Sequence, residues 1–224
     1  LNAAVAESLG EITEQIRAKV KKGAKVDDVV LGVVRDAFKE SAAIRFEGNN
    51  YSEDWVKEAA KRGLLNLRRS PEALDQLNTK QSKTLLIALG IFTKEELESR
   101  YHVRLERYAK DMLIEMHTLK EIVDTLILPA AFSYSGSLAA SAAHAKSAGI
   151  AKVPQVAAAN EVGAMIESLR KGRDSLDAVI AKAEHMHDSP AKQAKLLTGD
   201  GADTMATVRE CCDVGARKIL QNGG

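Results

Sequence analysis

The chain has 224 residues, enough for one or two domains with a sizeable core. Its 32 Lys and Arg residues nearly balance 31 Asp and Glu residues, and the net charge of +1 gives no indication of nucleic acid or an anionic membrane as a partner. Aromatic residues make up only 4% of the chain, a composition typical of helical proteins.

The sequence also argues against a transmembrane span, a signal peptide and a disulfide bond. No run of about 20 apolar residues is present, so we expect no transmembrane span. The first residues carry no signal-peptide pattern, and because the chain opens on Leu1 inside an amphipathic segment, we expect it to belong to a longer polypeptide. The only cysteines, Cys211 and Cys212, are adjacent and therefore poor disulfide partners. We interpret them as free thiols in a reducing compartment, the cytoplasm.

Two amphipathic helices are predicted at the start of the chain, over residues 1–22 and 26–41. Apolar residues recur every three or four positions in both, and Gly23 occupies the position after the first helix. In the second helix we expect the apolar side chains to face inward. They are Val29, Val30, Val33, Val34 and Phe38.

The loop over residues 43–52 carries more sequence detail than a connector needs. Glycine and paired asparagines tolerate positive φ, so a structured loop is predicted, with at most a short strand at residues 44–46. The candidates for a structured loop or interface are Phe46, Gly48, Asn49, Asn50, Tyr51 and Trp55. The alternative, which we favour, is that the three aromatic side chains pack the loop onto neighbouring helices.

Short helices follow, and capping residues mark their ends. Ser52 is predicted to cap a helix that Gly63 ends, and Pro71 to open the next. Thr79 or Ser82 is predicted to cap a third helix.

The longest predicted helix covers residues 94–128. Thr93 and Glu96 form a capping box at its start. At 1.5 Å per residue this helix would be about 50 Å long, more than a compact domain of this size needs, and we expect Pro129 to interrupt it. Its apolar residues follow an eleven-residue repeat that keeps them on one face. They are Leu97, Tyr101, Leu105, Tyr108, Met112, Met116, Leu119, Val123 and Ile127.

The last third of the chain predicts antiparallel partners for this helix. Residues 132–149 are rich in Ala and Ser and fit either a closely packed helix or a loose connection. A seven-residue stripe predicts a helix over residues 156–187, and Met205, Val208, Cys212, Gly215 and Ile219 form a last stripe after a turn at residues 198–201. The first stripe comprises Val162, Met165, Ile166, Leu169, Leu176, Val179, Ile180 and Ala183.

The sequence contains no convincing catalytic or metal-binding set. His185 and His187 lack the further ligands that zinc requires. Glu184 and His187 have the spacing of a di-iron pair, but a di-iron site needs two such pairs. Cys211 and Cys212 lack the paired histidine of a catalytic thiol. We therefore predict no catalytic, cofactor-binding or metal-binding residue in this stretch.

These elements predict an all-α fold in which long antiparallel helices, as a hairpin or bundle, follow shorter helices. We divide the chain into a short-helix region, residues 1–92, and a long-helix region, residues 93–224, that together form one continuous unit.

The order of the motifs resembles the C-terminal region of type III glutamine synthetases. The similarity is strong from residue 1 to about residue 138, and beyond that only the helix layout is similar. The motifs are, in chain order, Phe46-x-Gly48-x-Asn50-Tyr51-Ser52-x-x-Trp55, Glu58-Ala59-x-x-Arg62-Gly63-Leu64-x-Asn66-Leu67, Ser70-Pro71-Glu72-Ala73-Leu74, Ser99-Arg100-Tyr101, Leu105-Glu106-x-Tyr108, Ile114-Glu115 and Ile127-Leu128-Pro129-Ala130.

The resemblance implies a parent enzyme that joins ammonia to glutamate through γ-glutamyl phosphate, using ATP and Mg or Mn, in a cytoplasmic double-ring homo-oligomer. The family's catalytic strands are not among these residues. The resemblance therefore implies a helical region that packs on the catalytic domain of the same chain, contributes to subunit contacts and is inactive alone. The alternative is a free-standing helical scaffold or adaptor that self-associates through the long helix.

Overall fold

A computed structural model describes residues 1–222, with side chains described as far as Arg217. The predicted all-α fold is confirmed, since the described residues contain helices and no strand. The chain divides into two compact units, Leu1–Tyr101 and His102–Gly224, and the division falls inside one long helix. The functional division that we placed between residues 92 and 93 stays a prediction.

The first unit consists of short helices. Residue Ile44, where a short strand was possible, ends a 3-10 turn instead. The elements are α1 (Asn2–Lys21), α2 (Val26–Glu40), η1 (Ser41–Ile44), α3 (Glu53–Lys61), α4 (Ser70–Asp75), η2 (Gln76–Asn78), α5 (Lys80–Ala88) and the start of α6 (Lys94–Ile122).

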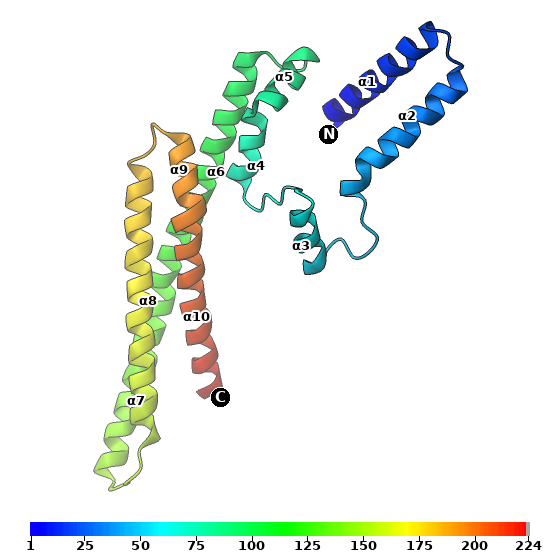
Figure 1. Ribbon diagram of the computed structural model, residues 1–224. Helices are drawn as coiled ribbons and strands as arrows, with labels where there is room; N and C mark the ends of the chain where they lie inside the picture. The colour runs from blue at the N-terminus through cyan, green and yellow to red at the C-terminus, as the bar shows by residue number, and fades with distance from the viewer. Residues whose placement is uncertain (223–224) are drawn as a thin grey trace. The chain divides into compact units, whose positions relative to one another are not determined.

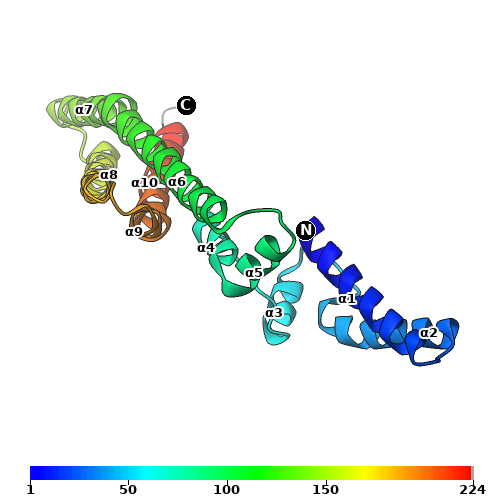
Figure 2. The ribbon, with the colours of Figure 1, turned by 90° about the horizontal axis from the view of Figure 1, so that it is seen from above.

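Helices α1 and α2 form an antiparallel hairpin (Figures 1 and 2). The hairpin turns at Gly23, whose φ of 94° favours glycine, as predicted. The prediction that all five apolar side chains of α2 face inward is wrong: Val29 and Val33 are buried, whereas Val30, Val34 and Phe38 are exposed. A two-helix hairpin can cover only one narrow stripe of each helix, so the rest of this apolar face lies in solvent in the isolated chain.

The helix starts predicted at Ser52, Thr79 and Thr93 are confirmed by side-chain caps, whereas α4, predicted to open at Pro71, begins at Ser70 without one. The Trp55 amide donates to Ser52 Oγ at 3.3 Å, and the Ser82 amide donates to Thr79 Oγ1 at 3.3 Å. At the start of α6 the two bonds of the capping box both form. The Glu96 amide donates to Thr93 Oγ1 at 3.2 Å and the Thr93 amide donates to Glu96 Oε2 at 2.9 Å.

The second unit is built from long helices that lie side by side (Figure 1). Helix α8 packs against both α7 and α10. After the rest of α6, the elements are η3 (Val123–Ile127), α7 (Leu128–Ser147), α8 (Pro154–Glu184), α9 (Pro190–Leu196), η4 (Leu197–Gly201) and α10 (Ala202–Asn222).

The expected interruption at Pro129 does not occur. Helical structure continues from Lys94 to Ser147, 54 residues in all, and residues 132–149, which the sequence left open, are mostly helix. The π-helical turn η3 precedes the proline, and in it the Leu128 amide bonds to the carbonyl of Val123, five residues back. Proline has no amide hydrogen for the carbonyl four residues before it, and a widened turn at this point lets the helix continue.

The turn predicted at residues 198–201 is also wrong. Helices α9 and α10 continue through the π-helical turn η4 without a break. Gly199 and Gly201 both have negative φ, so neither provides the turn conformation that glycine permits. The hydroxyl of Thr198 is instead turned inward and donates to the Tyr108 hydroxyl at 2.8 Å.

The core of the second unit is formed by the predicted apolar stripes. Met116 and Val123 of the long helix, Leu176 of α8 and Val208 of α10 are each 0% exposed. Helices α8 and α10 approach closely at Gly172, where an added Cβ would lie 3.2 Å from Val208 Cγ2. The side chain of Ile219, the last member of the predicted α10 stripe, lies outside the described residues.

The helix from Lys94 to Ser147 is long and apolar enough to cross a membrane by length and composition alone. Only 17% of its most apolar window is buried inside the structure. The helix therefore presents apolar surface that the described part of the chain leaves uncovered.

Candidate functional site

The loop before α3 is held by two aromatic rings. Phe46 and Trp55 lie with ring centroids 4.4 Å apart, tilted by 30°. Both side chains are half-buried. The Tyr51 side chain, which we expected to pack with them, is 98% exposed. The structure thus brings two of the three aromatic candidates together and leaves the third in solvent.

The backbone of this loop is fixed by short-range contacts. Gly48 has a φ of +153°, and a Cβ there would lie 2.9 Å from Phe46 Cε1, so both its conformation and its surroundings favour glycine. The Asn49 side chain accepts the Tyr51 amide at 3.0 Å, and the Asn49 carbonyl accepts the Ser52 hydroxyl at 2.8 Å. Asn49 and the exposed Asn50 both keep negative φ, so of the three residues that tolerate positive φ only the glycine uses it.

Arg62 ties the loop to α3. Its Nη1 donates to the Arg45 carbonyl at 2.7 Å, and its guanidinium carbon lies 5.6 Å from the centre of the Trp55 ring. Glu58 pairs with Arg62 Nε at 2.9 Å and orients the guanidinium. The loop is therefore linked to α3 at both ends, which restricts its motion.

A second polar contact in the first unit joins Tyr101 to Asp75. The Tyr101 hydroxyl donates to Asp75 Oδ1 at 2.6 Å. Burial of the ring, with the hydrogen bond and the negative charge of Asp75, raises the pKa of Tyr101 to about 12.

Replacing Tyr101 with Phe should lower the free energy of unfolding by about 1.5–3 kcal/mol at pH 7, the usual range for a hydrogen bond to a charged acceptor. Above pH 10 the unfolded tyrosine loses its proton while the folded one retains it. The stability advantage of the wild type is therefore fully present below pH 10 and lost as pH rises towards 12. Urea unfolding of both proteins across this range tests the expectation, which a pH-independent difference would contradict.

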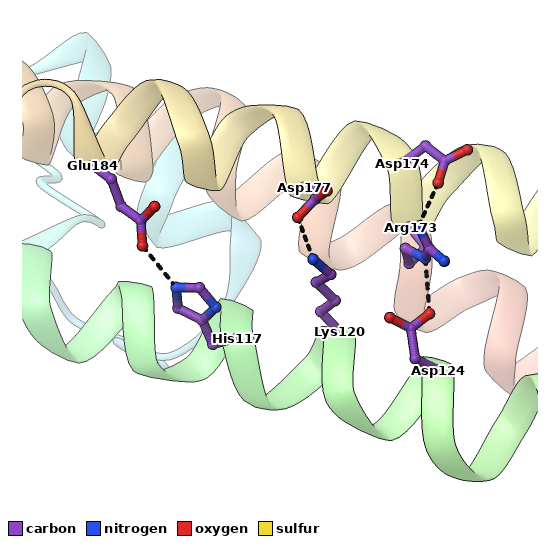
Figure 3. A network of polar contacts seen from close by, with 7 residues as sticks. All are labelled: His117, Lys120, Asp124, Arg173, Asp174, Asp177 and Glu184. Carbon is purple, nitrogen blue, oxygen red and sulfur yellow. Dashed lines mark hydrogen bonds and ion pairs between the residues drawn. The ribbon is translucent and has the colours of Figure 1, made fainter.

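A ladder of ion pairs joins α6 and η3 to α8 (Figure 3). His117 Nε2 lies 3.0 Å from Glu184 Oε1, Lys120 contacts Asp177, and Asp124 Oδ1 accepts Arg173 Nε at 2.8 Å. Arg173 also pairs with Asp174 of its own helix at 2.8 Å. The residue numbers rise on one helix as they fall on the other, so the ladder fixes an antiparallel register.

The ladder holds α6 and η3 against α8. Its inter-helix side chains are about one-third to one-half exposed, and ion pairs that are open to solvent contribute little to stability each. The hydrogen bond from Lys120 holds the pKa of Asp177 below its usual range. We did not predict this ladder from the sequence. The only indication in the sequence is the spacing of the charged residues, which is three and four residues along the long helix and four and seven along α8.

Residues of η3, α7, α8 and α10 line an apolar groove of about 470 Å³. Small side chains line its walls, including Ala130 and Ala131 on one side and Gly215 and Ala216 on the other. Its other lining residues are Leu126, Ile127, Val162, Met165, Ile166, Leu169, Cys211, Cys212 and Asp213. A groove lined in this way fits an apolar surface and has few groups with which to orient a polar substrate.

The two cysteines in this groove are free thiols, as predicted. Burial raises the pKa of Cys212, and the neighbouring Cys211 and Asp213 raise it further. A raised pKa reduces the thiolate fraction, so this thiol is not activated as a nucleophile.

The histidines that we weighed as metal ligands lie after the end of α8 and contact backbone carbonyls of that helix. His185 Nδ1 lies 2.7 Å from the Ala181 carbonyl, and His187 Nδ1 lies 3.2 Å from the Glu184 carbonyl. The Glu184 carboxylate turns to His117 on the other helix and does not pair with His187. Within residues 1–222 no three His, Cys, Asp or Glu side chains gather as a metal site.

The fold and these sites define a class: an all-α helical region whose helices leave apolar surface exposed. The comparisons with known proteins give the family. Residues 29–146 match the glutamine synthetase C-terminal domain. The chain belongs to this family, and the resemblance to type III glutamine synthetases is confirmed.

Three relatives carry the same similarity. The chain is 37% identical over 138 residues to a glutamine synthetase of Bacteroides fragilis (strain YCH46), covering 62% of this chain and 19% of the relative. It is 36% identical over 141 residues to a type-3 glutamine synthetase of Dictyostelium discoideum, covering 63% and 19%. A glutamine synthetase of Butyrivibrio fibrisolvens is 39% identical over 101 residues, covering 45% and 14%. The chain thus matches about a fifth or less of the length of these relatives.

Proposed function

We propose that this chain is the C-terminal helical region of a glutamine synthetase and that it supplies packing surface to the catalytic domain and to neighbouring subunits. The observation that carries this role is the apolar surface left uncovered on its helices. On α2, Leu31 is 70%, Phe38 61% and Val34 58% exposed. Apolar faces of this extent are typical of surfaces that another protein covers.

The parent enzyme, in this proposal, joins ammonia to glutamate through γ-glutamyl phosphate and assembles as a cytoplasmic double ring. Its ATP and its Mg or Mn ions would be bound by the catalytic part, because phosphoryl transfer requires carboxylate-held divalent ions and a phosphate cradle. The described helices offer neither group. The names of the relatives and the family match support the reaction, and the uncovered apolar faces support the packing role.

The long helix packs against protein and does not enter a membrane, in this proposal. Lys120 and Asp124 of the long helix pair with Asp177 and Arg173 of α8 alongside it. Through these ion pairs the long helix is in contact with protein along this stretch. Lipid is not proposed as a partner, and nucleic acid is not proposed because the net charge is only +1.

An enzyme assay tests the proposal. The polypeptide that carries this chain should form glutamine from glutamate, ammonia and ATP in the presence of Mg or Mn, whereas the 224-residue chain alone should form none. Turnover by the chain alone would contradict the assignment of catalysis to other residues. A longer polypeptide that forms no glutamine would contradict the proposed reaction.

The second candidate is a helical scaffold that self-associates through the long helix, which the open groove beside α7 favours. The polypeptide that carries this chain in the cell separates the two, by its intact mass and by the glutamine assay. A longer polypeptide that forms glutamine favours the enzyme region, and a 224-residue polypeptide that self-associates and forms no glutamine favours the scaffold.

A further inference from the structure

Tyr51 lies at the tip of the loop between η1 and α3 and contributes nothing to the packing that holds the loop. Its side chain is 98% exposed, while Phe46 and Trp55 stack on each other 4.4 Å apart. An exposed tyrosine ring carries a large apolar area into water with no compensation in the chain itself. The ring stands out of the surface as a knob that is free to enter a pocket on a partner.

The loop holds this knob in one place. The Tyr51 amide is bonded to Asn49 Oδ1, and Ser52 is bonded to the Asn49 carbonyl and caps α3. Gly48 lies so close to Phe46 that no Cβ fits without movement. A side chain presented by a rigid loop loses little freedom on binding, and tyrosine, with two side-chain torsions, loses less than a long flexible residue.

The charged residues next to Tyr51 in the sequence restrict the kind of partner that the ring can bind. The charged residues nearest to Tyr51 in sequence are Glu53, Asp54 and Glu47, and all three are exposed. These carboxylates repel the phosphates of nucleic acid and of anionic lipid surfaces. They complement a protein surface with basic residues at the rim of an apolar pocket.

We propose that Tyr51 anchors this loop to the catalytic part of the glutamine synthetase, with its ring in an apolar pocket that has a basic rim and a hydrogen-bonding group for the hydroxyl. The inference rests on the proposed function and adds the residue that makes the contact. Interface anchors of this type are enriched in tyrosine and are surrounded by residues that contribute little themselves.

Oxidative footprinting with hydroxyl radicals, read by mass spectrometry, tests the contact without any substitution. Tyr51 should be oxidised rapidly in the isolated 224-residue chain. In the full polypeptide that carries the chain, its oxidation rate should fall several-fold below the rate in the isolated chain. An unchanged Tyr51 oxidation rate in the full polypeptide would overturn the proposal.

Two substitutions give an independent measurement. Tyr51→Ala should leave the thermal midpoint of the isolated chain unchanged, because the ring is exposed there, and should lower that of the full polypeptide. A hot-spot tyrosine lost in this way weakens its contact by about 30-fold. Tyr51→Phe should have a smaller effect, and Lys57→Ala, an exposed position on α3, should have none. Equal midpoints for Tyr51→Ala and wild type in the full polypeptide would overturn the anchor role.

The glutamine assay keeps the two proposals apart. Glutamine formation with no protection of Tyr51 would leave the enzyme assignment in place and overturn the anchor. Protection of Tyr51 in a polypeptide that forms no glutamine would support the contact and overturn the proposed function.

Discussion

Replacing Leu105 with Asp should destabilise the chain by on the order of 3 kcal/mol or more, the largest effect that we expect of a single substitution. Leu105 is 1% exposed, so a carboxylate at this position would lose its hydration without gaining a partner. Urea unfolding followed by circular dichroism measures the change. An aspartate that leaves the midpoint unaltered would show that this face of α6 is open to solvent.

Val103 provides the matched control, because it lies two residues earlier on the same helix and is 58% exposed. Val103→Asp introduces the same charge into the same helix and should change the free energy of unfolding by no more than about 0.5 kcal/mol. Both variants place an aspartate and its charge on the same helix. The difference between their free energies of unfolding therefore measures the effect of burial at Leu105.

Replacing Leu176 with Ala should lower the free energy of unfolding by about 2–5 kcal/mol, through lost burial and the cavity that remains. Leu176 is 0% exposed and lies in the core of the second unit with Met116 and Val208. Leu126→Ala makes the same change at a side chain that is 64% exposed, and its effect in the isolated chain should stay within about 0.5 kcal/mol. Equal losses for the two variants would contradict the position of the core.

The sequence predicted best those features that depend on neighbouring residues. The capping box of Thr93 and Glu96 forms, because the two side chains need only a helix start to reach each other. The stripe of the long helix is buried or half-buried at every position for the same reason, since its spacing alone places Leu97, Leu105 and Met116 on one face.

The failures occurred where tertiary contacts override a local signal. Pro129 and the glycines of residues 198–201 favour breaks, but packing against α8 keeps both segments helical, at the cost of one widened turn each. The exposed face of α2 could not be foreseen either, because an apolar stripe predicts that something covers it and does not say whether that partner lies in the same chain.

The position of the candidate loop could be predicted from its composition. Which of its aromatic rings packs inward could not. Gly, Asn and three aromatic residues within ten positions indicated a structured loop. Which ring packs inward depends on the path of the backbone between Gly48 and Ser52, and this path is set by hydrogen bonds that composition does not encode. From the sequence we therefore expected the Tyr51 ring to pack in the same way as those of Phe46 and Trp55.

The π-helical turn at Val123–Ile127 lets the long helix hold one extra residue without losing its facing. Such a turn takes one more residue than an α-helical turn to complete the same rotation. The extra residue is therefore absorbed in the wide turn, and the α7 surface is not rotated relative to α6. A related protein with one residue fewer here should have a regular α-helical turn and present the same side of α7 to its neighbours.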